Sequence, residues 1–240
     1  MIETYYTGCY WLARQEPVEA CAKRLEDFLR RLGPLESTWN RWHQTAATFE
    51  KARKRQVQPD AATIAKLMGS KADRFLDRSS FWLWAGENED ELSGVKGHCG
   101  SSSTRMSSVC LLNIPSQGSV AERVLTAPVM TGVVRAMALA WEPEFGIATS
   151  QEHRELAVPE GFPNAGSFVG WVMYFARSRG PVPPLPAPVQ VEHLEDRGTL
   201  ITLTPERFTV ANPDHVALAA DVQARLQEAG LLRRLRPWGT

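Results

Sequence analysis

The stretch ETYYTGCYWLARQEPVEACAKRLEDFLRRLGP, residues 3–34, contains two elements with different residue patterns. Residues 3–14 are rich in Tyr, Thr and Trp, which favour the pleated, half-buried surface of a β-strand. A helix is predicted to begin at Pro17, because proline is favoured at the first helical position, and to end at Gly33-Pro34. Its apolar residues recur at helical spacing and predict one buried face, formed by Val18, Cys21, Leu25, Phe28, Leu29 and Leu32.

Further strands are predicted downstream of this strand–helix unit. Residues 80–85 (SFWLWA) and 106–114 have the composition of buried strands, and we expect them to pair in antiparallel fashion around a long loop. Residues 168–177 predict another strand. Residues 189–193 and 199–203 predict two more, joined by a turn.

Helices are predicted between these strands and after them. Pro59-Asp60 begins a short helix through Met68, and Ser119 caps a helix that Pro128 bends or interrupts. Asn212-Pro213 begins the last helix, whose apolar face contains Leu218, Val222, Leu226 and Ala229. Trp39 and Trp42 are three residues apart, which suits one face of a helix.

Strands and helices do not alternate regularly, so the predicted fold class is α+β, with a mainly antiparallel sheet and helices packed on its faces. Residues 181–188 contain five prolines and predict an extended connector. The segment that follows this connector is short for an independent domain. We therefore expect one domain over residues 1–240.

Charge, targeting signals and cysteines limit the possible functions. Lys+Arg and Asp+Glu each total 27, so no global attraction to nucleic acid or to anionic lipid is expected. The N-terminus lacks the pattern of a signal peptide, and polar residues interrupt the longest apolar stretch, 120–141. We expect a cytoplasmic protein with no membrane partner, in which Cys9, Cys21, Cys99 and Cys110 are free, buried thiols.

Sequence motifs for catalysis are absent. GxGxxG, GxxxxGK[ST], GxSxG and HExxH do not occur, so no enzymatic activity and no cofactor are expected. One alternative is an enzyme of another class with a site near His98 and Cys99, although adjacent residues on an extended segment point to opposite faces. A zinc site built from His98, Cys99 and Cys110 lacks the usual ligand spacing, so no metal is expected.

Two charged clusters remain as candidates for binding. The basic run from Lys51 to Arg55 raises the alternative of a nucleic-acid-binding protein, but no aromatic residues interleave it, so no direct nucleic-acid contact is expected. The acidic loop follows two tryptophans, and acidic residues beside aromatic anchors are suited to docking on a basic partner. The predicted partner-binding residues are Glu87, Glu89, Asp90, Glu91, Trp82 and Trp84.

The order and spacing of several segments resemble the immunity protein 52 family of bacterial polymorphic toxin systems. The resemblance covers nearly the whole chain and is carried by Tyr5–Trp11, Arg14, Glu19–Ala22, Ser80–Trp84, Ala140–Gly146, Val169–Phe175, Gly198–Leu200 and Asn212–Val216.

This resemblance implies that the chain binds and neutralises a cognate toxin encoded nearby. The implied toxin is a nuclease effector with a restriction-endonuclease-like fold, delivered by a contact-dependent or type VI secretion system. The resemblance implies no catalytic residues, and it transfers no binding residues position by position. Occlusion of the toxin's active site by the acidic loop, with Trp82 or Trp84 as a packing anchor, is our mechanistic hypothesis.

Overall fold

The computed structural model describes residues 2–69, 78–103, 107–158 and 167–235. Across these residues runs one open sheet of ten strands, every adjacent pair of which is antiparallel. In sheet order, the strands are β3 (Gln56–Val57), β2 (Trp42–Gln44), β4 (Ser79–Ala85), β5 (Ser93–Cys99), β6 (Ser108–Asn113), β1 (Tyr5–Trp11), β7 (Phe145–Ser150), β8 (Val172–Ala176), β10 (Gly198–Thr202) and β9 (Gln190–Leu194).

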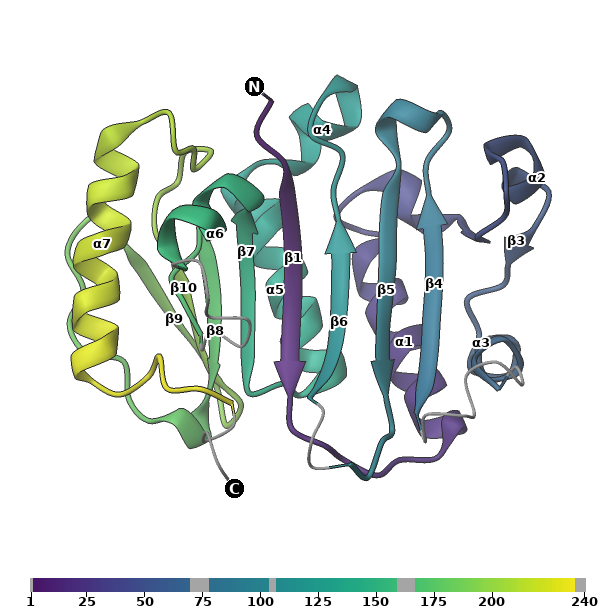
Figure 1. Ribbon diagram of the computed structural model, residues 1–240, viewed down its shortest axis with the longest axis horizontal. Helices are drawn as coiled ribbons and strands as arrows, with labels where there is room; N and C mark the ends of the chain where they lie inside the picture. Colours follow the sequence, from purple (N-terminus) through teal and green to yellow (C-terminus); the bar gives the residue numbers. More distant parts are fainter. Residues whose placement is uncertain (1, 70–77, 104–106, 159–166, 236–240) are drawn as a thin grey trace.

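Seven α-helices in the described residues accompany the sheet, which confirms the predicted α+β class (Figure 1). They are α1 (Val18–Leu32), α2 (Phe49–Arg53), α3 (Ala61–Met68), α4 (Gly118–Val124), α5 (Ala127–Trp141), α6 (Gln151–Ala157) and α7 (Pro213–Glu228). Short 3₁₀ turns are η1 (Ser37–Asn40), η3 (Glu89–Glu91) and η4 (Arg177–Arg179).

Helix α1 forms as the sequence predicted, one residue later at its start. Pro17 is the N-cap residue, and the helix ends at Gly33. Its buried residues are the predicted ones from Cys21 to Leu32, with Ala22 beside them, whereas Val18 is only half-buried. Full burial of each Leu or Phe contributes about 1.5–3 kcal/mol, so this face fixes α1 against α3 and α5.

Helices α4 and α5 form where one interrupted helix was predicted. The break falls between Val124 and Ala127, and Pro128 occupies the first turn of α5. Among the described residues, no single helix is both long enough and apolar enough to cross a bilayer. Only α4 and α5 together reach that length and composition, with a bend of 77° between them.

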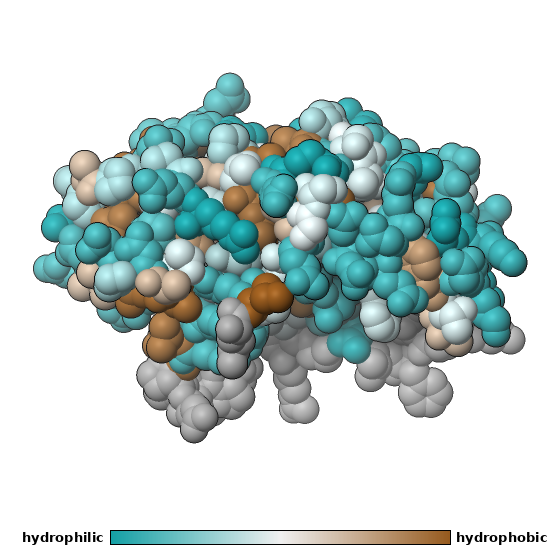
Figure 2. All heavy atoms as spheres, turned by 90° about the horizontal axis from the view of Figure 1, so that it is seen from above, coloured by the Kyte–Doolittle hydropathy of each residue, from teal (hydrophilic) through white to brown (hydrophobic). Residues whose placement is uncertain are grey.

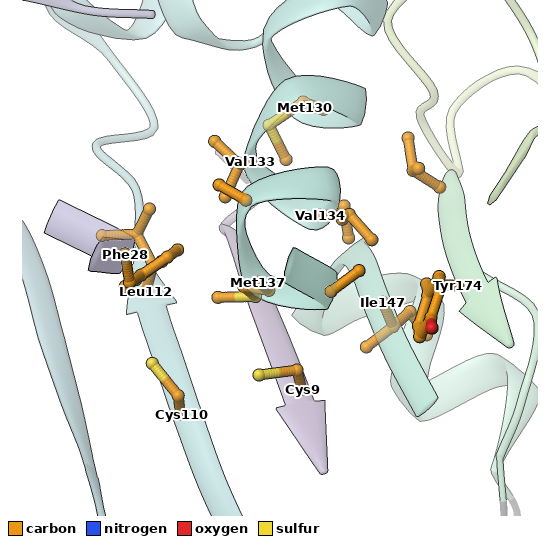
Figure 3. Close-up of a cluster of buried hydrophobic side chains, with 14 of the residues drawn as sticks. Cys9, Phe28, Cys110, Leu112, Met130, Val133, Val134, Met137, Ile147 and Tyr174 are labelled. Atoms are coloured by element: carbon orange, nitrogen blue, oxygen red, sulfur yellow. The ribbon is translucent and has the colours of Figure 1, made fainter. Parts of the chain in front are cut away.

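The central core lies between α5 and the middle strands of the sheet (Figure 3). Met137 and Val134 of α5 lie over Cys9 of β1 and Tyr174 of β8. These four side chains are buried. All four cysteines are free and buried, as predicted.

Most of the C-terminal predictions are confirmed. Residues 181–186 form no helix or strand, β9 and β10 form an antiparallel hairpin, and Asn212 caps α7. The connector ends in a turn at residues 187–188, where the Val189 N–H donates to the Pro186 carbonyl (3.0 Å). Val222 and Leu226 of α7 are buried, but Ala229 is exposed after the helix ends. The predicted strand at residues 168–177 is shorter and spans only β8.

The expectation of a shared helix face for Trp39 and Trp42 is wrong. Trp39 lies in η1, whereas Trp42 begins β2. Both rings are nonetheless fully buried, and each indole N–H has a partner there: that of Trp39 donates to Ser93 Oγ (2.8 Å) and that of Trp42 to the Trp39 carbonyl (2.7 Å). The two tryptophans are joined by a hydrogen bond and do not share a helix face.

The expected pairing of residues 80–85 with 106–114 is also wrong. Strand β5 lies between β4 and β6 and pairs with both. The strand predicted to start at Met106 begins at Ser108, and Met106 itself lies outside the described residues. Strand β7 and helix α6 were not predicted either, so the sheet is wider than the sequence pattern indicated.

The two faces of the sheet are covered differently. Figure 1 shows α1 and α5 behind the sheet and α6 and α7 in front of it, toward the end formed by β7–β10. On the front face, Ile147, Met173 and Ile201 face one another across β7, β8 and β10 and are fully buried. The same face of β4, β5, β6 and β1 has no helix in front of it in the described part of the chain. We call this region the open sheet face; its side chains are Ser80, Trp82, Lys96, His98, Val109, Leu111, Asn113, Tyr6 and Tyr10.

Candidate binding surface

The predicted acidic loop is a short connection between β4 and β5, and we call residues 87–91 the acidic turn. Glu91 anchors it to α4: its Oε1 accepts hydrogen bonds from Ser119 Oγ (3.0 Å) and from the Val120 N–H (3.2 Å). The Asn88 amide donates to Glu91 Oε2 (2.7 Å), and Asn88 Oδ1 accepts from the Glu91 N–H (3.0 Å). Hydrogen bonds from Asn88 and then from Val120 lower the pKa of Glu91, so this carboxylate holds the turn in place.

The other acidic residues of the turn differ in their contacts. Glu87 forms an ion pair with Arg41, which follows η1. Glu89 and Asp90 lie in η3, and both are exposed. Neither of their carboxylates forms an ion pair or hydrogen bond with another residue that the structure describes. The turn is therefore fixed at Glu87 and Glu91, while Glu89 and Asp90 remain available to a partner.

The two tryptophans of β4 have different surroundings. Trp82 is 62% exposed, whereas Trp84 is 7% exposed. The ring of Trp84 stacks on His43 (4.7 Å between centroids) and contacts Phe49 (5.2 Å), and its N–H donates to the Gln44 carbonyl (3.1 Å). Trp84 is thus part of the packing around β2 and α2, and only Trp82 presents its ring to solvent.

Trp82 lines a hollow that opens on the open sheet face. Its Cα is paired with that of Lys96 on β5, which is paired in turn with Leu111 on β6. A cavity of about 520 Å³ extends from this face over β4 to α3. It is lined by Ser80–Leu83, Lys96–His98, Val109, Leu111, Gln44, Thr45, Leu25, Ile64, Leu67 and Met68.

The acidic turn lies at an end of the sheet that carries mostly hydrophilic side chains, with scattered hydrophobic ones (Figure 2). Trp82 is three residues, or about 10 Å at roughly 3.3 Å per residue, from the end of β4, and the acidic turn begins two residues beyond that end. The structure therefore puts Trp82, Glu89 and Asp90 on the same hairpin, at separate positions along it.

The alternative site near His98 and Cys99 does not form a working pair. His98 lies on the open sheet face and its Nε2 is 2.9 Å from the Ser107 carbonyl oxygen, whereas Cys99 is completely buried on the other face. The neighbouring Cys21 thiol and burial raise the pKa of Cys99, which disfavours a nucleophilic thiolate. In the described part of the chain, no group of three or more His, Cys, Asp or Glu side chains could hold a metal ion.

The basic run is an exposed surface of α2 and the residues after it. Lys51, Arg53, Lys54 and Arg55 are exposed. The guanidinium of Arg53 lies over the Phe49 ring, at 5.6 Å from its centroid. This ring also packs on Trp84, so it is engaged inside the protein and is not free to stack on a base.

Lys96, Leu111 and the α3 residues of the cavity were not identified from the sequence. Lys96 was not identified because strand β5, on which it lies, was not predicted. The signal that could have found Leu111 is the alternation along residues 108–113, where Val109 and Leu111 are half-exposed and Cys110 and Leu112 are buried. The α3 residues belong to the cavity only because α3 packs beside β4, which is a tertiary contact.

Comparison with known proteins identifies the family. The family model described as immunity protein 52 (Imm52) matches residues 3–235, nearly the whole chain. The chain belongs to the immunity protein 52 family. None of the curated proteins matches this Imm52 chain.

A solved structure shares the fold of this Imm52 protein. It is a type VI secretion system (T6SS) protein from Pseudomonas aeruginosa, with a TM-score of 0.56 and 15% sequence identity. The match covers 99% of this chain and 85% of the other. At this identity the similarity establishes a common fold for the Imm52 chain and the Pseudomonas protein.

Proposed function

We propose that this Imm52 protein neutralises a nuclease effector with a restriction-endonuclease-like fold by covering its active site with the acidic turn. The effector is encoded nearby and is delivered by a contact-dependent or type VI secretion system. Membership of an immunity-protein family supports a cognate toxin as the partner. The T6SS description of the Pseudomonas protein with the same fold supports this delivery route.

The observation that carries the proposed mechanism is the state of the four carboxylates in the acidic turn. Glu91 and Glu87 hold the turn through α4 and Arg41, while Glu89 and Asp90 extend from it without a partner among the described residues. A turn that is already ordered loses little conformational freedom on binding. Two free carboxylates on such a turn are complementary to the basic residues that line a nuclease substrate groove.

Co-expression tests the function itself. The adjacent reading frame is expressed in bacteria with and without this chain, and growth and plasmid integrity are followed. We expect the neighbour alone to stop growth and degrade DNA, and the pair to grow and to co-purify. If the neighbour arrests growth without damaging DNA and this chain relieves the arrest, the immunity function stands but the proposal that the target is a nuclease is wrong.

Charge reversal tests the role of the acidic turn. The double variant Glu89→Lys/Asp90→Lys should associate with the neighbour's product at least about tenfold more slowly at low salt, because opposite charges steer encounter. The difference should shrink as salt is added. Glu206→Lys/Glu228→Lys is the matched control, since both residues are exposed and the net charge changes equally. If both double variants associate at the wild-type rate, the acidic turn is not the interface.

A further inference from the structure

One part of strand β4 lacks a neighbour on its outer side. Strand β2 pairs with β4 only at His43–Trp84 and Gln44–Leu83. The remainder of β4, from Ser79 to Trp82, pairs with β5 on its inner side, and no described strand pairs with its outer side. In an antiparallel ladder alternate residues direct their N–H and C=O groups outward. This segment therefore offers an edge to which another strand can hydrogen-bond.

The cavity of about 520 Å³ begins at this same edge. Its inner end is apolar and is formed by Leu25 of α1 together with Ile64 and Met68 of α3. Its outer part crosses the open sheet face beside Trp82. A strand laid along Ser79–Trp82 would direct alternate side chains into the inner end and over the open sheet face.

The charge along the cavity restricts the composition of its occupant. Lys96 is exposed and is the only Lys or Arg among the described lining residues, which include no Asp or Glu. An occupant with a carboxylate near Lys96 and an apolar side chain at the inner end complements both features. Gln44 and Thr45 mark where the chain's own strand β2 leaves this edge.

We propose that an extended segment of the cognate toxin adds to the sheet as a strand beside Ser79–Trp82, continuing the position of β2. An apolar side chain of that segment fills the space next to Leu25, Ile64 and Met68, and an acidic one pairs with Lys96. This proposal rests on the proposed function, because it takes the toxin as the partner. It adds the binding mode, which is recognition through backbone hydrogen bonds with side-chain pockets.

Binding measurements with the full-length chain test the groove, with the purified product of the adjacent reading frame as the probe. Leu67→Glu places a charge at a half-buried position of the cavity lining. We expect the Kd for the toxin to rise about 30-fold or more, as it does when a central anchor residue of an interface is lost. Lys96→Glu reverses the charge beside Trp82, and we expect a rise of about tenfold. Amide hydrogen exchange at residues 79–82 should slow in the wild-type complex, because strand addition protects outward N–H groups.

Two matched variants control for charge and folding. Leu156→Glu changes an equally apolar side chain that is 65% exposed on α6, and Lys66→Glu reverses an exposed lysine of α3 outside the cavity lining. Both should bind within about twofold of wild type. Thermal unfolding identifies any variant that fails to fold. If Leu67→Glu does not fold, Lys96→Glu still tests the groove, because Lys96 is exposed and its replacement leaves the core unchanged.

The possible outcomes separate the two proposals. If wild type binds and neutralises its neighbour but the groove variants bind like their controls, the groove proposal is wrong and the proposed function stands. If wild type neither binds nor neutralises, both are wrong. If the chain alone forms dimers that Leu67→Glu dissociates, the groove holds a second copy, and the toxin-strand proposal is overturned.

Discussion

The two tryptophans of β4 show how far single residues could be predicted. Trp82 and Trp84 are two positions apart on a strand, so their side chains point to the same face of the sheet. One is exposed and the other buried, because His43 and Phe49 cover only Trp84. The sequence shows an aromatic pair beside an acidic loop. The residues that cover Trp84, however, lie about 40 positions earlier in the chain, so the pattern of nearby residues does not reveal which tryptophan is buried.

Glu36 is a buried carboxylate that connects η1 to α4. Its Oε2 and Oε1 accept hydrogen bonds from Arg123 Nε (2.9 Å) and Nη2 (3.0 Å), and Oε1 also accepts from the Thr38 N–H (3.1 Å). These contacts, those of Arg123 foremost, lower the pKa of Glu36 from 4.5 to about 2. The carboxylate is therefore held in its charged form in the folded protein.

The substitution Glu36→Gln should lower the free energy of unfolding at pH 7 by about 1.5–3 kcal/mol, the range for a hydrogen bond to a charged group. Because the folded-state pKa is lowered, the stabilisation is complete above about pH 4.5 and disappears as the pH falls toward about 2. Urea unfolding measured in steps from pH 7 to pH 3.5 should show the difference between variant and wild type shrinking. A difference that stays constant over this range would mean that the charge of Glu36 is not its source.

Among the elements, β5 was the strand that the sequence did not reveal. Its residues, SGVKGHC, include two glycines, a lysine and a histidine, which are poor strand signals. Helices α1, α3 and α7 were predictable because their caps and periodicity are local features. Strand β5 depends on neighbours on both sides, and Gly97 shows why a weak strand former is needed there.

Gly97 and Gly94 form a matched pair within β5. A Cβ at Gly97 would lie 2.2 Å from the Val109 carbonyl oxygen and 2.7 Å from Phe81 Cζ, whereas one at Gly94 would meet nothing within 4 Å. Gly97→Ala should therefore lower the free energy of unfolding by about 1–3 kcal/mol, the cost of overpacking. Gly94→Ala should change it by less than about 0.5 kcal/mol. Chemical denaturation checks both, and equal effects would show that the crowding at Gly97 relaxes without cost.

At the scale of the whole molecule, the sequence predicted the class of fold but not the strand order. The α+β class follows from counting strands and helices along the chain. The order of the sheet depends on long-range pairing, such as that of β1 with β6 and β7. The open sheet face results from this order, because the front helices α6 and α7 lie toward the β7–β10 end.

Local stability should differ across the sheet. Strand β1 is paired along both edges and covered by α5, whereas β2 and β3 have three and two residues and lie at the end of the sheet. Native-state hydrogen exchange should therefore be slowest for amides of β1 and fastest for those of β2 and β3. Comparable exchange rates in β1 and β2 would indicate that the sheet opens as one unit.

The central position of β1 also affects when this protein can protect a cell. Cys9 pairs with Cys110 on one side and with Gly146 on the other, so β1 has no sheet partner until those residues have left the ribosome. Translation of the intervening residues takes on the order of ten seconds. During that interval both edges of the nascent β1 segment are without their partner strands. Each newly synthesised copy of this immunity protein therefore folds only after a delay. Copies that are synthesised before the toxin arrives would avoid that delay.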